Sequence, residues 1–149
     1  MMLTVTDRAK KVLALAAEGA RRRGQQRARP ENVLLALLDE AGGVACAVLH
    51  TLGVDPAALA RDLEARLHAP PPNAEPGGEA PSDEPPPGLL NAAAAEARDL
   101  GHGYVGTEHL LIAMTRTEGE LTAQALAARG VTPATAVATT ARLLGRQIT

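Results

Sequence analysis

Apolar residues recur at the spacing of an α-helix along most of this chain. Ala9, Leu13, Ala16, Ala17 and Ala20 would share one face of a first helix that ends at Gly24. By the same criterion, further helices are predicted over about residues 30–41, 44–52, 56–68, 89–100, 107–116, 120–129 and from 133 onward.

Cap residues support these boundaries. Thr6 is a predicted N-cap, and Asp7 in the first turn favours the helix dipole. Pro30, Pro56 and Pro133 each suit the first position of a helix, where the missing N–H costs nothing.

The chain contains this pattern twice. The stretch GHGYVGTEHLLIAM, which begins at Gly101, aligns without a gap on GQQRARPENVLLAL, which begins at Gly24, so the displacement is 77 positions. One register that holds from Leu13 to Leu144 indicates an internal repeat. In this register Asp83-Glu84-Pro85-Pro86 replaces the start of the first helix, so the first helix of the second copy is expected to begin late.

Between the copies, residues 69–88 hold eight of the eleven prolines and are acidic through Glu75, Glu79, Asp83 and Glu84. This composition predicts an extended linker. The expected organisation is one domain over 1–149, with repeat one at 1–68, the linker at 69–88 and repeat two at 89–149. Because the apolar residues are mostly Ala and Leu, with one Tyr and no Phe or Trp, the predicted class is all-α.

Several function classes find no support in the sequence. There is no P-loop motif and no catalytic arrangement, which predicts a non-enzymatic protein without cofactors. His50, His68, His102 and His109 lack ligand-like spacing, and Cys46 stands alone in a predicted helix, so neither a metal site nor a disulfide is expected. The absence of a leader and of a long apolar run favours a cytoplasmic protein without a membrane span.

Arginines cluster around the first turn between helices, at Arg21, Arg22, Arg23, Arg27 and Arg29. Such a cluster can bind nucleic acid. The formal net charge of -2 and the lack of stacking aromatic residues argue against that partner, and a solvated helix end is favoured instead. A docking patch for an acidic protein surface is the remaining alternative.

The TDRAKKVL stretch from Thr6, the LGHGYVGTEHLLIAM stretch from Leu100 and the Leu-Gly-Val at residues 52–54 resemble the Clp N-terminal domain family. The resemblance covers nearly the whole chain except the linker. It implies two four-helix repeats packed with pseudo-twofold symmetry into one all-α domain. It also implies that this domain recruits substrates and adaptor proteins to a Clp-type AAA+ unfoldase and does no chemistry.

The resemblance further implies phosphoarginine sites, made by the acid of each GTEH motif and the residue that opens each first helix. Carried over by register, these residues are Thr6 with Glu31, and Asp83 with Glu108. In the first copy Pro30 stands at the position that Thr107 holds in the second, so the hydroxyl group is missing there. In the second copy the Asp83 carboxylate would repel a phosphate. These departures favour the alternative that both acids simply stabilise the first turn of a helix.

A hydrophobic groove near the pseudo-twofold axis, used by adaptors and cyclic peptides, is also implied. Its walls would include Met2, Val5 and Ser82, although Met2 and Val5 equally suit a role in covering the core. The function predicted on these grounds is a substrate- or adaptor-binding module of a Clp protease system. Two alternatives are a free-standing decoy that sequesters cyclic peptides and the N-terminal part of a longer Clp ATPase.

Overall fold

The helices lie where the pattern predicts them. The computed structural model describes residues 4–25, 27–40, 43–67, 86, 88–116 and 121–144. The elements are β1 (Thr4–Val5), α1 (Asp7–Arg22), α2 (Pro30–Glu40), α3 (Val44–Thr51), α4 (Pro56–Leu67), α5 (Leu89–Asp99), β2 (Tyr104–Val105), α6 (Thr107–Thr115), α7 (Leu121–Ala127) and α8 (Pro133–Leu144). The all-α class is confirmed, with two short strands added to it.

The predicted caps are present in the structure. The Thr6 hydroxyl oxygen accepts a hydrogen bond from the backbone N–H of Ala9 at 3.1 Å, as an N-cap does. The helices α1 and α5 both end before a glycine with positive φ, 73° at Gly24 and 77° at Gly101. Because glycine adopts this left-handed conformation without steric cost, the same helix-ending turn forms in both repeats.

The first helix of the second repeat begins late, as expected. The helix α1 spans 16 residues and α5 spans 11. The helix α5 begins at Leu89, after the prolines that exclude a regular helix interior.

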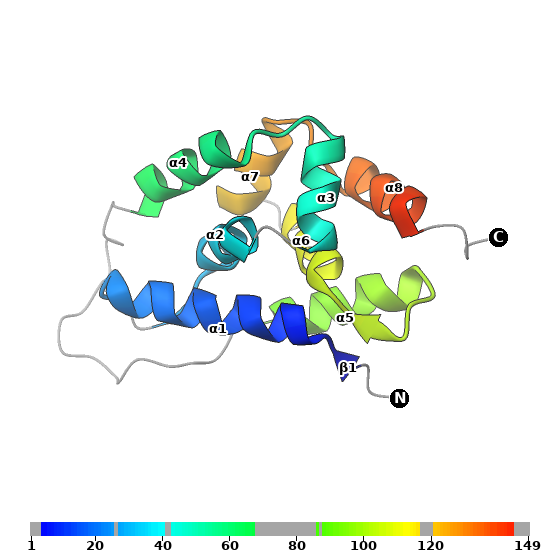
Figure 1. The fold of residues 1–149 in the computed structure, drawn as a ribbon, viewed down its shortest axis with the longest axis horizontal. Helices are drawn as coiled ribbons and strands as arrows, with labels where there is room; N and C mark the ends of the chain where they lie inside the picture. Colours follow the sequence, from blue (N-terminus) through cyan, green and yellow to red (C-terminus); the bar gives the residue numbers. More distant parts are fainter. Residues whose placement is uncertain are drawn as a thin grey trace.

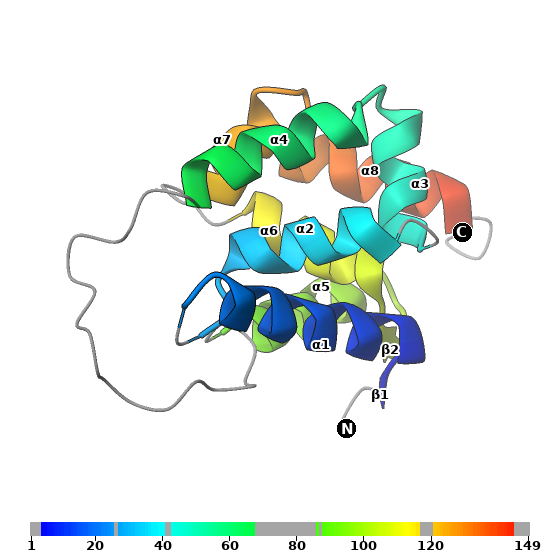
Figure 2. The same ribbon diagram turned by 60° about the vertical axis from the view of Figure 1, so that its left-hand side comes forward.

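The helices stack in three tiers, with α1 and α5 at one side, α2 and α6 in the middle, and α4, α7 and α8 at the other side (Figures 1 and 2). The middle helices are the most buried, and every residue of α6 from Thr107 to Thr115 is buried. One core runs through both repeats; among its largest fully buried side chains are Leu34, Leu37, Leu59, Leu63, Leu110, Leu111 and Ile112. Ala-rich stretches of α1 and α5 allow those helices to approach α2 and α6 closely.

A two-residue parallel pairing joins the repeats, and the hydrophobic pattern did not predict it. Thr4 pairs with Tyr104 and Val5 with Val105. The backbone N–H of Thr6 then donates to the Val105 carbonyl at 3.0 Å. A pairing between residues so far apart in the sequence leaves no local pattern, so the sequence predicts only an apolar segment before the first helix.

A second link between the repeats is a side-chain cap. The Thr107 hydroxyl oxygen, on α6, accepts the backbone N–H of Ala45 at 3.2 Å and so caps α3. A Cβ on Gly43 would lie 2.6 Å from this oxygen, so only glycine fits there. The start of α3 is therefore completed by a residue 62 positions away.

Three predicted site residues, Met2, Ser82 and Asp83, lie outside the described residues, as does the predicted linker apart from Pro86 and Gly88. Within the described part of the chain, no single helix is long and apolar enough to cross a membrane. The pair α2 and α3 has the combined length and composition, but it is bent by 88° at the break between them.

Candidate functional site

Two acidic residues occupy the same position in the two repeats. Glu31 lies in the first turn of α2 and Glu108 in the first turn of α6. Only 4% of Glu31 and 2% of Glu108 is exposed. An acid in a first turn is usually solvated, so the burial of both carboxylates distinguishes them from ordinary first-turn acids.

The Glu108 carboxylate has a partner. The Tyr104 hydroxyl donates a hydrogen bond to Glu108 Oε2 at 3.1 Å. Burial, followed by the nearby Glu108 charge, raises the pKa of Tyr104 to about 12. A Cβ on Gly106 would lie 2.5 Å from Glu108 Oε1, so the glycine makes room for the carboxylate.

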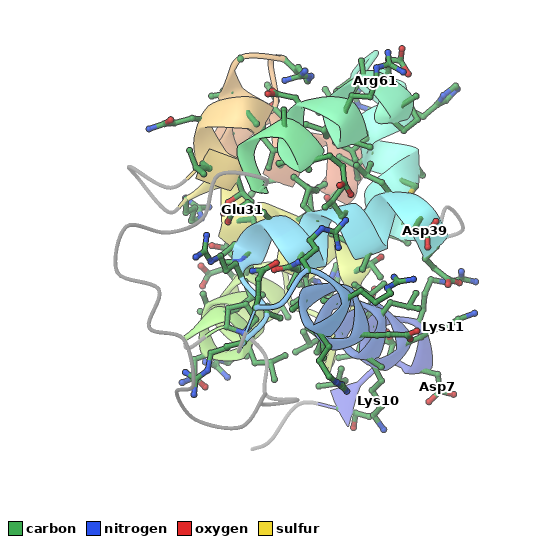
Figure 3. The ribbon with its side chains drawn as sticks, turned by 90° about the vertical axis from the view of Figure 1, so that its left-hand side faces the viewer. Asp7, Lys10, Lys11, Glu31, Asp39 and Arg61 are labelled. Atoms are coloured by element: carbon green, nitrogen blue, oxygen red, sulfur yellow. The ribbon has the colours of Figure 1, made fainter. Side chains whose placement is uncertain are left out.

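The Glu31 carboxylate differs. Its Oε1 is buried and has no hydrogen-bond partner among the described residues. Figure 3 shows Glu31 at the start of α2, at the opposite end of that helix from Asp39. A buried carboxylate oxygen without a donor is costly, by about 1–3 kcal/mol or more. Of the carboxylate oxygens of Glu31 and Glu108, Glu31 Oε1 is therefore the one that an additional N–H donor would stabilise most.

A pair of histidines supports the Glu108 turn. His109 Nδ1 accepts the backbone N–H of Gly106 at 2.8 Å, and His109 Nε2 lies 2.8 Å from His102 Nδ1. Since Nδ1 of His109 is an acceptor, its proton must be on Nε2, which then donates to His102. Burial, followed by the charge of His102, lowers the pKa of His109 to about 4, so this ring is neutral at pH 7.

Repeat one makes the same arrangement with amides. The Asn32 side-chain oxygen accepts the backbone N–H of Arg29 at 2.8 Å. The Gln25 and Asn32 amides exchange two hydrogen bonds of 3.2 Å each. Gln25 and Asn32 match His102 and His109 in the register, which is the signal in the sequence that could have identified this pair.

The structure brings together two histidines whose spacing in the sequence did not suggest a ligand set. Ligand atoms of His102, Glu108 and His109 all lie within 4.8 Å of one another. The arrangement still does not suit a metal ion. Metal binding through Nε2 of His109 would require an imidazolate, because the other nitrogen already accepts an N–H.

The structure also changes how the predicted residues group. Thr6 lies beside Val105, in the loop that leads to Glu108. Glu31 lies at the other end of α1, where Gln25 meets Asn32, about 24 Å away along a 16-residue helix. The structure therefore places Thr6 beside the loop that leads to Glu108 and at the opposite end of α1 from Glu31, so it does not bring together the pair that the register gave.

Val5 and Cys46 are both half-buried. Val5 packs against the core, which supports the covering role considered for it. The Cys46 thiol donates to the Leu37 carbonyl at 3.1 Å and is less buried than expected for a core cysteine.

Comparisons with known proteins identify the family of this chain. The model of the Clp repeat (R) N-terminal domain matches residues 4–86 and again residues 83–149. The chain is 36% identical over 115 residues to the negative regulator of genetic competence ClpC/MecB of Bacillus subtilis, which is 77% of this chain and 14% of that protein. It is 32% identical over 140 residues to the chloroplastic chaperone protein ClpC2 of Oryza sativa subsp. japonica, which is 94% of this chain and 15% of that protein.

Solved structures share the fold. The Hsp104 N-terminal domain from Candida albicans superposes with a TM-score of 0.74 at 19% identity, covering 95% of this chain and 92% of that one. The N-terminal domain of ClpD from Arabidopsis thaliana gives a TM-score of 0.68 at 17% identity, covering 97% of both chains. This chain spans only 14–15% of the length of the curated relatives named above. The two matches to the family model cover one repeat each. The chain therefore belongs to the Clp repeat (R) N-terminal domain family, with two copies of the repeat.

Proposed function

We propose that this chain is a non-catalytic module that binds a protein substrate or an adaptor on behalf of a Clp-type ATPase. The observation that carries the proposal is the Glu31 carboxylate, buried in the first turn of α2 with Oε1 unpartnered among the described residues. A module that recruits protein needs polar groups that anchor its ligand, and this buried oxygen can accept one more hydrogen bond.

The chemistry of the two acid positions suggests which group they would hold. A guanidinium offers several N–H donors to a carboxylate, and a helix N-terminus attracts an anion. Phosphoarginine combines both groups and is therefore the direct probe. Pro30 supplies neither a backbone N–H nor a hydroxyl, so any affinity at Glu31 has to come mainly from the guanidinium.

Titration calorimetry with phosphoarginine tests this proposal. Glu31→Ala should abolish the heat of binding if Glu31 is the anchor, and Glu108→Ala should do so if the second repeat is used. Glu18→Ala is the matched control, because Glu18 is an exposed acid on α1 and outside both positions. Binding that survives in both site variants, or no binding at all, would remove these acids as anchors.

The partner requires a separate measurement. Co-sedimentation with a purified Clp-type ATPase and an adaptor would support a recruitment module through a complex of defined stoichiometry. The decoy alternative instead predicts tight binding of a cyclic peptide without such a complex. A cytoplasmic location stays a prediction.

A further inference from the structure

A groove on repeat one is lined by α1, α2 and α4, and it encloses about 500 Å³. Its apolar lining residues include Leu15, Leu35, Leu38 and Ala60. Arg22 and Arg23 lie at the end of α1, beside the start of α2, where Gln25 bonds to Asn32. Asp39 lies near the other end of α2, where the neighbouring Glu40 pairs with Arg8 and Lys11 from the first part of α1. This groove is distinct from the two acid positions, because neither Glu31 nor Glu108 lines it.

Two of these charges have no partner within the described part of the chain. Arg23 pairs with Glu64 across the groove and also donates to the Gly19 carbonyl at 3.0 Å. Arg22 and Asp39 are both exposed and form no hydrogen bond or ion pair with any described residue. With respect to the described residues, the groove therefore has an unpaired cation, Arg22, toward one end and an unpaired carboxylate, Asp39, toward the other.

The second repeat shows why the groove is open. In the register, Gly19 corresponds to Glu96 and Asp39 corresponds to Arg116. Glu96 and Arg116 form an ion pair that joins α5 to α6 across the equivalent place. Repeat one has no side chain at Gly19, so Asp39 has no counterpart on α1.

The space over Gly19 faces positive charge. A Cβ placed there would lie 3.0 Å from Arg23 Nη1 and 3.9 Å from Arg22 Nη2. A carboxylate lying over Gly19 would thus meet two guanidinium groups, one of them otherwise unpaired. Asp39, at the opposite end of the groove, would accept an ammonium or guanidinium group.

We infer that this groove binds a short extended peptide segment that carries one acidic and one basic side chain. The acidic side chain lies over Gly19, against Arg22 and Arg23, and the basic side chain pairs with Asp39. From Asn32 to Asp39, α2 rises about 10 Å along the groove. An extended chain covers that distance in about three residues, so the two charges stand at positions i and i+3 of the ligand.

Two capped tetrapeptides test the inference, one with glutamate first and lysine last, and one with the reverse order, each with two alanines between. A third tetrapeptide has glutamine in place of both charged residues. Titration into ¹⁵N-labelled protein should shift the amides of Gly19 and Asp39 with one charged tetrapeptide and not with the neutral one. The proposal does not depend on the acid positions, so Glu31→Ala and Glu108→Ala should bind the peptide normally.

Charge-neutralising variants assign the contacts. Arg22→Gln and Asp39→Asn should each weaken binding about tenfold, as expected for the loss of one partly desolvated charge pair. Lys10→Gln and Glu18→Gln are matched controls, since each removes a charge of the same sign as Arg22 or Asp39, at an exposed position of α1 outside the groove. Gly19→Glu should abolish binding by placing a carboxylate where repeat two has one, and the Cβ would displace only flexible arginine tips.

The inference is overturned if neither charged peptide shifts these amides, or if the neutral peptide binds equally well. It is also overturned if Arg22→Gln and Asp39→Asn bind like the parent protein. Shifts of the same amides that depend on protein concentration without peptide would show a second copy of the chain in the groove, which contradicts the proposal.

Discussion

The imidazole rings of His102 and His109 meet at 2.8 Å, and His109 holds the turn before α6 by accepting the Gly106 N–H. Repeat one reaches the same geometry with Gln25 and Asn32. Two different pairs thus satisfy the equivalent backbone donor, but only repeat two does so with a titratable side chain, His109, whose pKa is lowered to about 4.

We expect stability to fall as the pH is lowered from about 6.5 to about 4. The pKa of His109 is lowered to about 4 in the folded chain, mainly by burial, whereas an unfolded chain takes up its proton near 6.5. The unfolded chain therefore binds more protons in this window. The stabilisation is complete above pH 6.5, is lost as the pH falls toward 4, and amounts to about 3 kcal/mol.

Urea denaturation at pH 7.5 and pH 4.5 measures this loss. The double variant His102→Gln, His109→Asn transplants the amide pair of repeat one and should reduce the pH dependence. An unchanged dependence would assign it to the carboxylates of the chain instead.

Tyr104 should ionise at a pH of about 12. It is the only tyrosine, so tyrosinate absorbance reports on this single hydroxyl. Because the Glu108 charge contributes to the raised pKa after burial, Glu108→Gln should lower the midpoint while leaving it above 10. An identical midpoint in Glu108→Gln would show that burial alone sets it.

Thr107→Val should reduce the free energy of unfolding by about 1 kcal/mol, because it removes the cap of α3. The same cap joins the repeats, so the amide of Ala45 should also exchange hydrogen faster in the variant. Denaturant titration and hydrogen exchange measure the two effects. Unchanged exchange at Ala45 would contradict a role for Thr107 as a cap.

Thr140→Val should raise the free energy of unfolding by about 1 kcal/mol. The Thr140 hydroxyl is fully buried and has no hydrogen-bond partner among the described residues, so a methyl group of similar shape removes a desolvation cost. Thr135→Val, also on α8, is the matched contrast. The Thr135 hydroxyl accepts the Thr132 N–H at 2.8 Å and donates to the Gly130 carbonyl at 2.9 Å, so its loss should destabilise the protein. Equal effects of the two variants would show that burial of the hydroxyls does not decide the outcome.

The sequence by itself determined the helices, their ends and the repeat, because these depend on local chemistry. Helical spacing of Ala and Leu, the prolines that open α2, α4 and α8, and the glycines that follow α1 and α5 act within a few residues. The alignment of the two repeats also predicted the late start of α5, since two consecutive prolines exclude a helix interior whatever the tertiary structure.

Only the tertiary structure decided which residues from different elements meet. The pairing of Val5 with Val105 and the cap from Thr107 to Ala45 depend on how the two repeats pack. The distance between Thr6 and Glu31 depends on how α1 packs against α2 within repeat one. The charges of the groove are a further case: Gly19 and Asp39 are ordinary residues in the sequence. Their role follows from the packing of the helices. In repeat two, the ion pair of Glu96 and Arg116 fills the space that stays open in repeat one.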